Sequence, residues 1–361
     1  MPSFGDGGVE RMLVNLAGGL ADQGLQVDFW VGSTAAPFLG RLPRQVRLVS
    51  PESGSGLWRA FTFWRYLRSE RPDVVLTAKD SALRTALRVR RLAGVQCRVV
   101  ARPGTTLSAR LAGRSPLTRL RALAGVRRSY RKADLIVANS RGVAEDVARV
   151  TGIDPQRIPV VRNPVVTPDL RRLSEMPLEH PWLAPGAPPV ILGVGGLRRQ
   201  KDFPTLLQAF AEVRARRPCH LVILGQGRLA ERLRAQSYAL GVAQDMELPG
   251  FVENPYPWLW RAGVFVLSSR WEGSPNVLTE AMALGTPVVA TDCPSGPREI
   301  LGDGRYGPLV PVGDPEAMAN AIIGVLERPL DRDALREAVR EYTVERCATR
   351  YLELLRLTVR P

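Results

Sequence analysis

The chain has 361 residues, 45% of them hydrophobic, and a formal net charge of +15. This length predicts two domains, each with its own core, and the absence of any apolar run of about 18 residues argues against a membrane span. The four cysteines are scattered and form no Cys/His cluster, which argues against a zinc site and a disulfide framework. The first residues contain no basic segment followed by an apolar one, which argues against a secretory signal. Both observations favour the cytoplasm.

The first element is a glycine-rich turn, Gly5 to Gly8 in MPSFGDGGVERM, that leads into an amphipathic helix. In nucleotide-binding α/β folds such a turn follows a strand, but only residues 1–4 precede it here. We therefore expect the first strand of the N-terminal domain to be missing, as it would be if the chain began at an internal methionine of a longer reading frame. Gly7 and Gly8 would let the backbone approach a diphosphate or an acceptor closely.

Strand-like apolar runs alternate with helical periodicity along the rest of the chain. The expected strands lie at 26–32, 46–50, 73–78, 97–101, 134–139, 158–163, 189–195, 219–225, 245–251, 263–269 and 286–291. Helical patterns lie between them, for example at 202–217, 227–240 and 276–284. This alternation predicts an α/β protein with two parallel sheets, each covered by helices on both faces.

A proline-rich segment separates the two halves of this pattern. We expect an N-terminal domain at 1–165, a linker at 166–188 and a C-terminal domain at 189–340. A last helical stretch is predicted at about 333–358, and residues 341–361 are expected to cross back to the first domain. Ligands of doubly wound sheets bind beyond the carboxyl ends of the strands, so the chemistry is expected in loops that follow strands.

The most informative loop is EGSPNVLTE, which follows the expected strand at 263–269. Its composition predicts a turn with Ser274 as N-cap and Pro275 at the first position of a helix that starts near Asn276. The first amides of that helix would form an anion site suited to a diphosphate; they belong to Asn276, Val277 and Leu278.

Two carboxylates, Glu272 in the turn and Glu280 on the helix, are separated by seven residues. A carboxylate can accept two hydroxyl hydrogen bonds, so one could hold a sugar and the other a ribose. Helix capping and a surface position would account for the same residues equally well on spacing alone.

This loop resembles the E-x7-E motif of the retaining, two-domain glycosyltransferases of family 4, and the resemblance covers nearly the whole chain. N-terminal matches are GGVERMLVNLAGGLADQG, ANSRGVAEDV and VVRNPV. C-terminal matches are VGGLRRQKDFPTLLQAF, LVILGQGRLAERL, LPGFVENPYPWL and EAMALGTPVVATDCPSGPREIL. The resemblance implies the GT-B architecture, in which two Rossmann-like doubly wound domains face a central cleft, and a nucleotide-sugar donor, UDP-linked in preference to GDP-linked.

The resemblance also implies residue roles in the C-terminal domain. Lys201 would bind the donor diphosphate, Glu272 the sugar and Glu280 the ribose. The family usually has an arginine at the position of Gly196, for which Arg198 or Arg199 would substitute. The remaining donor-binding residues expected are Gly225, Gly227, Phe251, Val252, Gly273, Ser274, Pro275, Asn276, Val277 and Leu278.

The N-terminal domain departs from the family pattern. Family members commonly have a histidine after the strand at 97–101, where VVARPGTTLS has Gly104, with Arg102 beside it as an expected acceptor-loop residue. His180 and His220 are expected to be structural. In front-face retaining transfer the leaving diphosphate can itself accept the acceptor's proton, so the missing histidine does not exclude activity. A catalytically weak or inactive homologue that binds a nucleotide-sugar or another anionic ligand remains the alternative.

No metal or other cofactor is expected. The sequence Asp331-Arg332-Asp333 matches the DxD of metal-dependent glycosyltransferases, but N-capping of the last helix explains it better. Ser295 and Gly296 resemble a second helix start near the donor, although ordinary turn chemistry explains them almost as well.

The positive charge is concentrated in the first half of the chain. Residues 1–180 contain 29 Lys/Arg against 15 Asp/Glu, and residues 81–133 contain 14 basic residues, no acidic one and a single aromatic, Tyr130. A solvated face is one explanation. The functional one is contact with an anionic membrane, with a saccharide or lipid-linked saccharide of envelope or exopolysaccharide synthesis as acceptor. A nucleic-acid partner is not expected, because such proteins interleave aromatic residues with basic ones.

Overall fold

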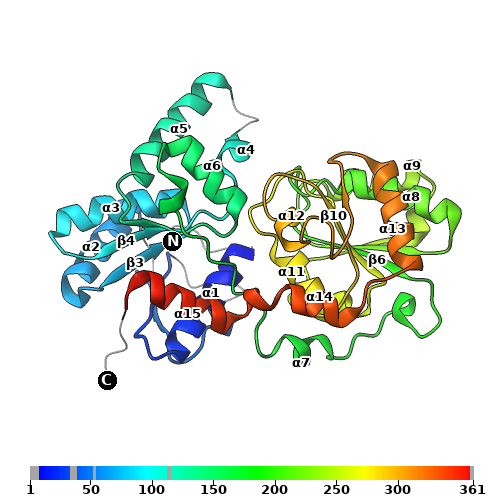
Figure 1. Ribbon diagram of the computed structural model, residues 1–361, viewed down its shortest axis with the longest axis horizontal. Coiled ribbons are helices and arrows are strands. Elements are labelled where there is room, and N and C mark those ends of the chain that lie inside the picture. Colours follow the sequence, from blue (N-terminus) through cyan, green and yellow to red (C-terminus); the bar gives the residue numbers. More distant parts are fainter. Residues whose placement is uncertain (1–7, 33–38, 52–53, 112–114, 358–361) are drawn as a thin grey trace. The chain divides into compact units, whose positions relative to one another are not determined.

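The computed structural model describes residues 8–32, 39–51, 54–111 and 115–357, so Gly7 of the expected glycine loop lies outside the described residues. The chain folds as two compact units: unit 1 contains residues 1–164 and 344–361, and unit 2 contains residues 165–343 (Figure 1). Both units have parallel strands joined by helices, which confirms the expected α/β class.

Unit 1 has two parallel sheets among its described residues. Strand β1 (Asp28–Trp30) pairs with β2 (Arg47–Val49), while β3 (Val74–Thr77), β4 (Arg98–Ala101) and β5 (Leu135–Ile136) form the second sheet. Its helices are α1 (Gly8–Asp22), α2 (Gly56–Glu70), α3 (Asp80–Ala93), α4 (Leu107–Leu111), α5 (Pro116–Tyr130), α6 (Arg141–Thr151) and α15 (Val344–Leu355). The strand expected at 158–163 is reduced to one isolated bridge between Ala138 and Val160.

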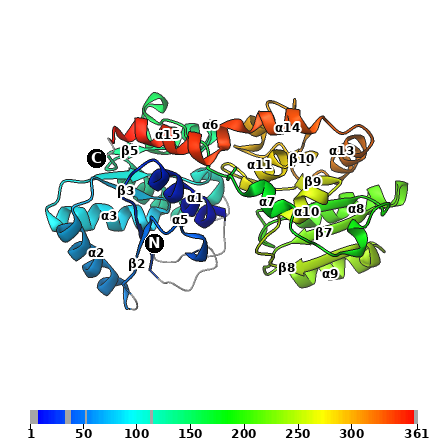
Figure 2. The ribbon, with the colours of Figure 1, turned by 90° about the horizontal axis from the view of Figure 1, so that it is seen from below.

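Two hydrophobic clusters cover the two faces of the β3–β5 sheet. On one face Leu16 of α1 and Tyr351 of α15 pack against Val100 of β4. On the other face α2, α3 and α6 pack around Val99, because successive residues of a strand point to opposite faces. Helices α1 and α15 touch closely, since a Cβ at Gly19 would lie 2.5 Å from Val344 Cγ1 (Figure 2).

A cavity of about 710 Å³ lies inside unit 1 between β1 and β3, which belong to different sheets. Residues 24–30 and 71–78 line two of its sides, and helices α1, α2, α3 and α15 also line it. Close-packed interiors rarely contain voids of this size.

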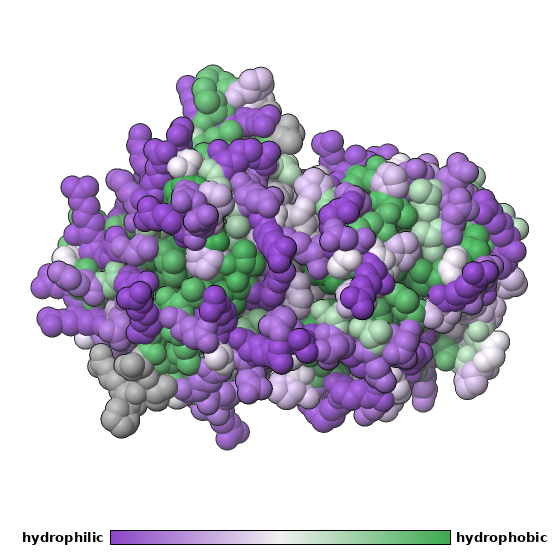
Figure 3. Space-filling view, viewed as in Figure 1, coloured by the Kyte–Doolittle hydropathy of each residue, from purple (hydrophilic) through white to green (hydrophobic). Residues whose placement is uncertain are grey.

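Figure 3 shows hydrophilic side chains over much of the visible surface of unit 1. Apolar side chains appear at the upper end of α5, the helix whose Leu117 and Leu120 are exposed. None of the described helices combines the length and apolarity that crossing a bilayer requires.

Unit 2 contains one six-stranded parallel sheet with the order β11-β10-β9-β6-β7-β8. The strands are β6 (Val190–Val194), β7 (His220–Leu224), β8 (Met246–Gly250), β9 (Val264–Leu267), β10 (Val288–Thr291) and β11 (Leu309–Val310). The helices are α7 (Leu170–Ser174), α8 (Phe203–Arg216), α9 (Ala230–Ala239), α10 (Tyr256–Arg261), α11 (Asn276–Ala283), α12 (Pro297–Ile300), α13 (Pro315–Glu327) and α14 (Arg332–Ala338).

Alternating side chains of this sheet supply both cores of unit 2. In β9, Phe265 and Leu267 point into the cluster formed with α10, α11 and α14. Val264 and Val266 point into the cluster formed with α8 and α13. Strands that are apolar on both faces are typical of a parallel sheet with helices on each side. This layering brings the carboxyl ends of β6, β7 and β9, and the loops after them, to one edge of the unit.

The segment expected as a linker at 166–188 is part of unit 2. Its helix α7 packs on the α10 side of the core through Leu170. The ring of Trp182 stacks on His220, with centroids 4.2 Å apart and planes 3° from parallel. Apolar and aromatic side chains among the prolines therefore anchor the segment, which composition alone did not reveal.

The last helical stretch is also divided differently from the prediction. Helix α14 ends at Ala338 and α15 begins at Val344, and between them Thr343 forms a parallel bridge with Val166. The Asp331 side chain accepts a hydrogen bond from the Ala334 amide at 3.0 Å. Its role as the N-cap of α14 is thereby confirmed.

Candidate active site

Lys201 and Glu272 meet at the carboxyl-end edge of the unit 2 sheet. Lys201 Nζ lies 2.6 Å from Glu272 Oε1, and the same oxygen accepts a hydrogen bond from Ser269 Oγ at 2.7 Å. The Glu272 side chain is 9% exposed and that of Lys201 is 20% exposed. The pair therefore combines a nearly buried, oriented carboxylate with an ammonium group that solvent can reach.

The loop after β6 is held in place by contacts with the loop after β9. Ser268 Oγ donates to the Lys201 carbonyl at 2.7 Å, and Gln200 Nε2 donates to the Trp271 carbonyl at 2.9 Å. Asp202 has a left-handed backbone with φ +48° and forms an ion pair with Arg270 at 3.0 Å. These contacts fix the backbone of Lys201, so that its side chain crosses to Glu272.

The turn that contains Glu272 packs on the turn before α12. Ser295 Oγ donates to the Gly273 carbonyl at 2.9 Å, and a Cβ at Gly296 would lie 2.7 Å from that same oxygen. Gly296 has φ +79°, so both its conformation and its surroundings favour glycine. Ser295 and Gly296 thus support the turn that holds Glu272.

Helix α11 begins at Asn276 as predicted, but the predicted capping is wrong. Pro275 has extended dihedrals (φ −70°, ψ 106°) and is itself the N-cap, so Ser274 lies one residue further out. A proline offers no side-chain acceptor for the first turn. The N–H groups in the first turn of any helix have no acceptor within that helix, so the start of α11 can still receive an anion.

Glu280 lies one turn into α11 and is 1% exposed. Glu280 is therefore not a solvated surface residue. Val277 and Leu278 on the same helix are also buried, and they anchor α11 in the core beside β9. The helix is short, and its burial fixes the position of its first turn relative to Glu272.

Gly225 and Gly227 allow two backbone loops to touch. A Cβ at Gly225 would lie 2.0 Å from the Gly195 oxygen, and one at Gly227 would lie 2.5 Å from the Leu197 oxygen. The Leu197 amide donates to the Gln226 carbonyl at 2.9 Å. These glycines therefore pack the loop after β7 against the loop that carries Lys201.

The other predicted donor residues lie on the surface of unit 2. Arg198 and Arg199 are exposed, and Arg198 folds over Gly196, where a Cβ would lie 3.2 Å from its Nε. Its guanidinium thus lies close to the position of the family's usual arginine. Phe251 is 39% exposed, which is unusual for a phenylalanine, and Val252 beside it is half-buried.

In unit 1, Arg102 is a buried framework residue. It is 2% exposed, its Nε donates to the Tyr351 hydroxyl at 2.8 Å, and its Nη2 donates to Asn163 Oδ1. This arrangement joins β4 to α15, and the acceptor-loop role expected for Arg102 stays a prediction. Gly8 is the first residue of α1. Gly104 lies near Val9 of the same helix, since a Cβ added at Gly104 would lie 3.6 Å from Val9 Cγ2.

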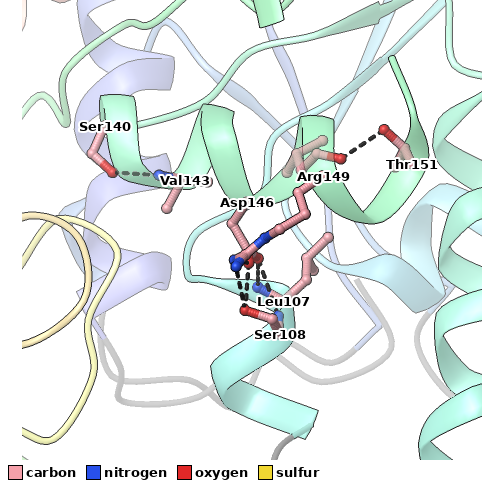
Figure 4. A network of polar contacts seen from close by, with 8 residues as sticks. Leu107, Ser108, Ser140, Val143, Asp146, Arg149 and Thr151 are labelled. Atoms are coloured by element: carbon pink, nitrogen blue, oxygen red, sulfur yellow. Dashed lines mark hydrogen bonds and ion pairs between the residues drawn. The ribbon is translucent and has the colours of Figure 1, made fainter. Parts of the chain in front are cut away.

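The loop around Gly104 is fixed by a buried carboxylate. Asp146 on α6 is 2% exposed and accepts from the Ser108 amide at 3.1 Å, from the Ser108 hydroxyl and from Arg149 (Figure 4). Asn139 Nδ2 donates to the Gly104 carbonyl at 3.2 Å. No histidine takes part in this network, in keeping with the sequence.

The two histidines have structural positions in unit 2. His180 Nδ1 accepts from the Trp182 amide at 3.2 Å, and its Nε2 lies 2.8 Å from Glu247. Burial lowers the pKa of His220, which stacks on Trp182. The neutral form of His220 is therefore favoured at neutral pH.

Several residues of the site were not predicted from the sequence. Ser269 orients Glu272, Asp202 and Gln200 fix the Lys201 loop, and Cys293 is buried nearby. Burial, together with the negative charge of Glu272, raises the pKa of the Cys293 thiol to about 12. The sequence signal for Ser269, Asp202 and Gln200 is their place in the loops that follow β9 and β6.

Both units match known protein families. Residues 6–168 match the family described as Glycosyltransferase Family 4, and residues 188–328 match Glycosyl transferases group 1. Together these matches cover most of the chain, and each falls largely within one of the two compact units.

Curated relatives include enzymes of glycan assembly. The chain is 36% identical over 209 residues to an N-acetylgalactosamine-N,N'-diacetylbacillosaminyl-diphospho-undecaprenol 4-alpha-N-acetylgalactosaminyltransferase of Campylobacter jejuni. That match covers 58% of the chain and 54% of the relative, so it spans about half of the relative's length. The chain is 28% identical to the lipopolysaccharide core biosynthesis glycosyltransferase LpsE of Rhizobium meliloti, over 97% of the chain and 96% of the relative.

Solved structures share the fold over the full length. The Anabaena protein Alr3699/HepE, in complex with UDP-glucose, aligns with a TM-score of 0.78 at 20% identity and covers 98% of this chain and 97% of its own. The apo lipopolysaccharide outer core galactosyltransferase WaaB aligns with a TM-score of 0.69 at 22% identity, over 97% of this chain and 95% of its own.

Proposed function

Since the chain belongs to the GT-B glycosyltransferases of the group 1 and family 4 type, we propose that it transfers a hexose or N-acetylhexosamine from a nucleotide-sugar to a hydroxyl group. The proposed donor is UDP-linked in preference to GDP-linked. The proposed acceptor is a saccharide or lipid-linked saccharide of envelope or exopolysaccharide synthesis. Relatives named for lipopolysaccharide core synthesis and for a diphospho-undecaprenol-linked acceptor support this choice, as does a structural neighbour solved with UDP-glucose.

The observation that carries the proposal is the contact between Lys201 and Glu272 close to the start of α11. Without donor, the ammonium group neutralises a nearly buried carboxylate. When a donor binds, Lys201 would turn to the diphosphate and Glu272 would accept hydroxyl hydrogen bonds from the sugar. Positive charge at the diphosphate stabilises the leaving group as its negative charge develops.

Two further sources of positive potential support a site without a metal ion. The N-terminus of α11 would offer its first amides to the diphosphate, and Arg198 over Gly196 adds an exposed guanidinium. We propose a metal-independent reaction with retained anomeric configuration, in which the leaving diphosphate accepts the proton of the acceptor hydroxyl. Glu280 would hold the ribose of the nucleotide.

We propose that the enzyme acts at the membrane surface. A lipid-linked acceptor lies at a bilayer surface, and the basic residues of unit 1 would bring the enzyme to anionic headgroups. The protein would then act as a cytoplasmic, peripheral membrane enzyme, with the nucleotide-sugar delivered from solution.

Incubation with a panel of UDP- and GDP-sugars and bacterial membrane extract, with mass spectrometry of the product, tests this function. One donor is expected to give a product that is one hexose or N-acetylhexosamine heavier. Lys201→Ala and Glu272→Ala are expected to reduce the product strongly, whereas Arg328→Ala, a change at an exposed residue of unit 2, should leave it unchanged. Full transfer by the first two variants would contradict the roles proposed here.

The alternative function is that of a weak or inactive homologue that binds a nucleotide-sugar. It is favoured by Gly104, which stands where family members commonly have a histidine, and by Arg102, whose side chain is engaged inside unit 1. UDP binding without donor hydrolysis or transfer, across the full panel, would support this alternative.

A further inference from the structure

The outer side of α2 exposes a row of large apolar side chains. Leu57 is 84% exposed, Trp58 49% and Phe61 48%. Residues three or four apart lie on one side of a helix, so the row continues through Trp64. The ring centroids of Trp58 and Phe61 are 5.7 Å apart, and those of Phe61 and Trp64 are 5.8 Å apart.

This row extends to the neighbouring helix α3. Figures 1 and 2 show α2 and α3 side by side, and the two helices are in contact. Trp64 Nε1 is 3.4 Å from the Leu92 carbonyl, to which it donates, and the Leu92 side chain is 77% exposed. Five large apolar residues from two helices thus form one surface.

Arginines flank the apolar row. Arg65 and Arg68 on α2 and Arg88 and Arg91 on α3 are exposed, and the Arg68 guanidinium lies 5.2 Å from the centroid of the Trp64 ring. Within the described residues none of these four has a carboxylate partner. As far as the described residues go, this charge is therefore available to an external anion.

We propose that the α2–α3 patch is the surface through which the protein docks on an anionic lipid bilayer. The patch comprises Leu57, Trp58, Phe61, Trp64, Leu92, Arg65, Arg68, Arg88 and Arg91. The inference deepens the proposed function, on which it rests for the reason to be at a membrane. It specifies the contact surface and the chemistry of the partner.

The combination of side chains fits an interface between water and lipid. Tryptophan and leucine side chains favour the headgroup boundary of a bilayer, where the apolar part of the ring is buried and its edge stays hydrated. Arginines beside them meet lipid phosphates, and their long stems can lie along apolar surface. Helix α5 also exposes Leu117 and Leu120, but it presents no aromatic side chain next to them.

Vesicle sedimentation tests the proposal without any glycosyl transfer. The full chain is mixed with vesicles of phosphatidylcholine alone or with about a third phosphatidylglycerol, at moderate and at high salt. Wild-type protein is expected to sediment with the anionic vesicles and much less with the neutral ones, and salt should weaken its binding. Equal binding to both vesicle types, or none to either, would overturn the proposal.

Matched variants locate the surface. Trp58→Ala with Phe61→Ala, and separately Arg65→Glu with Arg88→Glu, are each expected to reduce binding to anionic vesicles about tenfold or more. The control is Tyr238→Ala, an aromatic residue that is 74% exposed on α9 of unit 2. All the substituted side chains lie on helix surfaces. The melting temperature and the UDP binding of each variant report whether it is folded.

The outcomes separate this inference from the proposed function. Unchanged vesicle binding by both patch variants would overturn the inference even if transfer is confirmed. A self-associating form that both patch variants abolish, without vesicle binding by the wild type, would assign the patch to a second copy of the chain and would also overturn it. Vesicle binding that depends on the patch, in a protein that transfers no sugar, would support the inference and contradict the proposed function.

Discussion

Lys201 Nζ and Glu272 Oε1 are 2.6 Å apart although the two residues are separated by 71 positions in the chain. The contact exists because parallel strands β6 and β9 are neighbours, which brings the loops that follow them to the same edge of the sheet. Ser268 and Gln200 then fix the two loops to each other.

The first prediction concerns the energetic coupling of this pair. Lys201→Ala leaves the Glu272 carboxylate nearly buried without its cation and should lower the free energy of unfolding by about 1–3 kcal/mol. The double variant Lys201→Ala with Glu272→Gln should lose less than the sum of the two single variants. Urea unfolding of all four proteins measures the coupling, and strict additivity would show that the contact is energetically silent.

A second prediction concerns Gly225. Its Cβ would lie 2.0 Å from a backbone oxygen, so Gly225→Ala must displace one of the two loops at the site. We expect a loss of about 3 kcal/mol in stability and weaker UDP binding. Gly324→Ala on α13 is the matched control, because an added Cβ there has no neighbour within 4 Å and alanine favours helix. Comparable melting temperatures for the two variants would contradict the close approach.

Arg102 gives a third prediction. Arg102→Ala removes a buried guanidinium and leaves the polar atoms of Tyr351 and Asn163 without this partner. We expect a loss of about 3 kcal/mol and faster hydrogen exchange in α15. UDP binding by unit 2 should be retained. A stable variant that fails only in transfer to the acceptor would support the acceptor-loop role.

The fourth prediction is a loss of stability in alkali. Burial raises the pKa of Cys219 to about 11 and that of Cys293 to about 12, from 9.0. Above pH 9 the unfolded chain releases these protons first, so it binds fewer protons than the folded chain and stability falls as pH rises towards 11 and 12. At pH 10 each thiol should cost about 1 kcal/mol. Urea unfolding at pH 8 and at pH 10 measures this fall in the free energy of unfolding. The double variant Cys219→Ala with Cys293→Ala should show a smaller fall than the wild type.

Most of the fold follows from local patterns in the sequence. Apolar runs with helical periodicity between them located five of the six strands of unit 2 to within about two residues, since a parallel sheet covered on both faces requires continuous apolar strands. The two-residue strand β11 (Leu309–Val310) was not predicted, because so short a run gives no clear pattern. The segment at 158–163 has the same local pattern but forms one bridge, because pairing depends on neighbours that the pattern does not contain. The segment at 166–188 was expected to be an interdomain linker because of its prolines, and the structure adds that Leu170 and Trp182 pack it against unit 2.

The candidate site was predictable where a motif fixes residues within one loop. Glu272 and the start of α11 belong to one short segment, and the resemblance connected Lys201 to it. Asp202 and Gln200 act through contacts between loops, and such contacts depend on strand order and not on spacing along the chain. The capping at Ser274 was wrong because Pro275 adopts extended dihedrals and takes the N-cap position itself.

The most direct test of the account is a paired measurement of UDP binding and sugar transfer in wild-type protein, Lys201→Ala, Glu272→Gln and Arg328→Ala. The account predicts that Lys201→Ala weakens UDP binding at least tenfold and lowers transfer by about 100-fold, because the diphosphate loses its cation. Glu272→Gln should bind UDP as the wild type does and still lose transfer, because the Glu272 carboxylate is proposed to hold only the sugar. Arg328→Ala should match the wild type in both measurements. UDP binding and transfer at wild-type levels in both Lys201→Ala and Glu272→Gln would contradict the account.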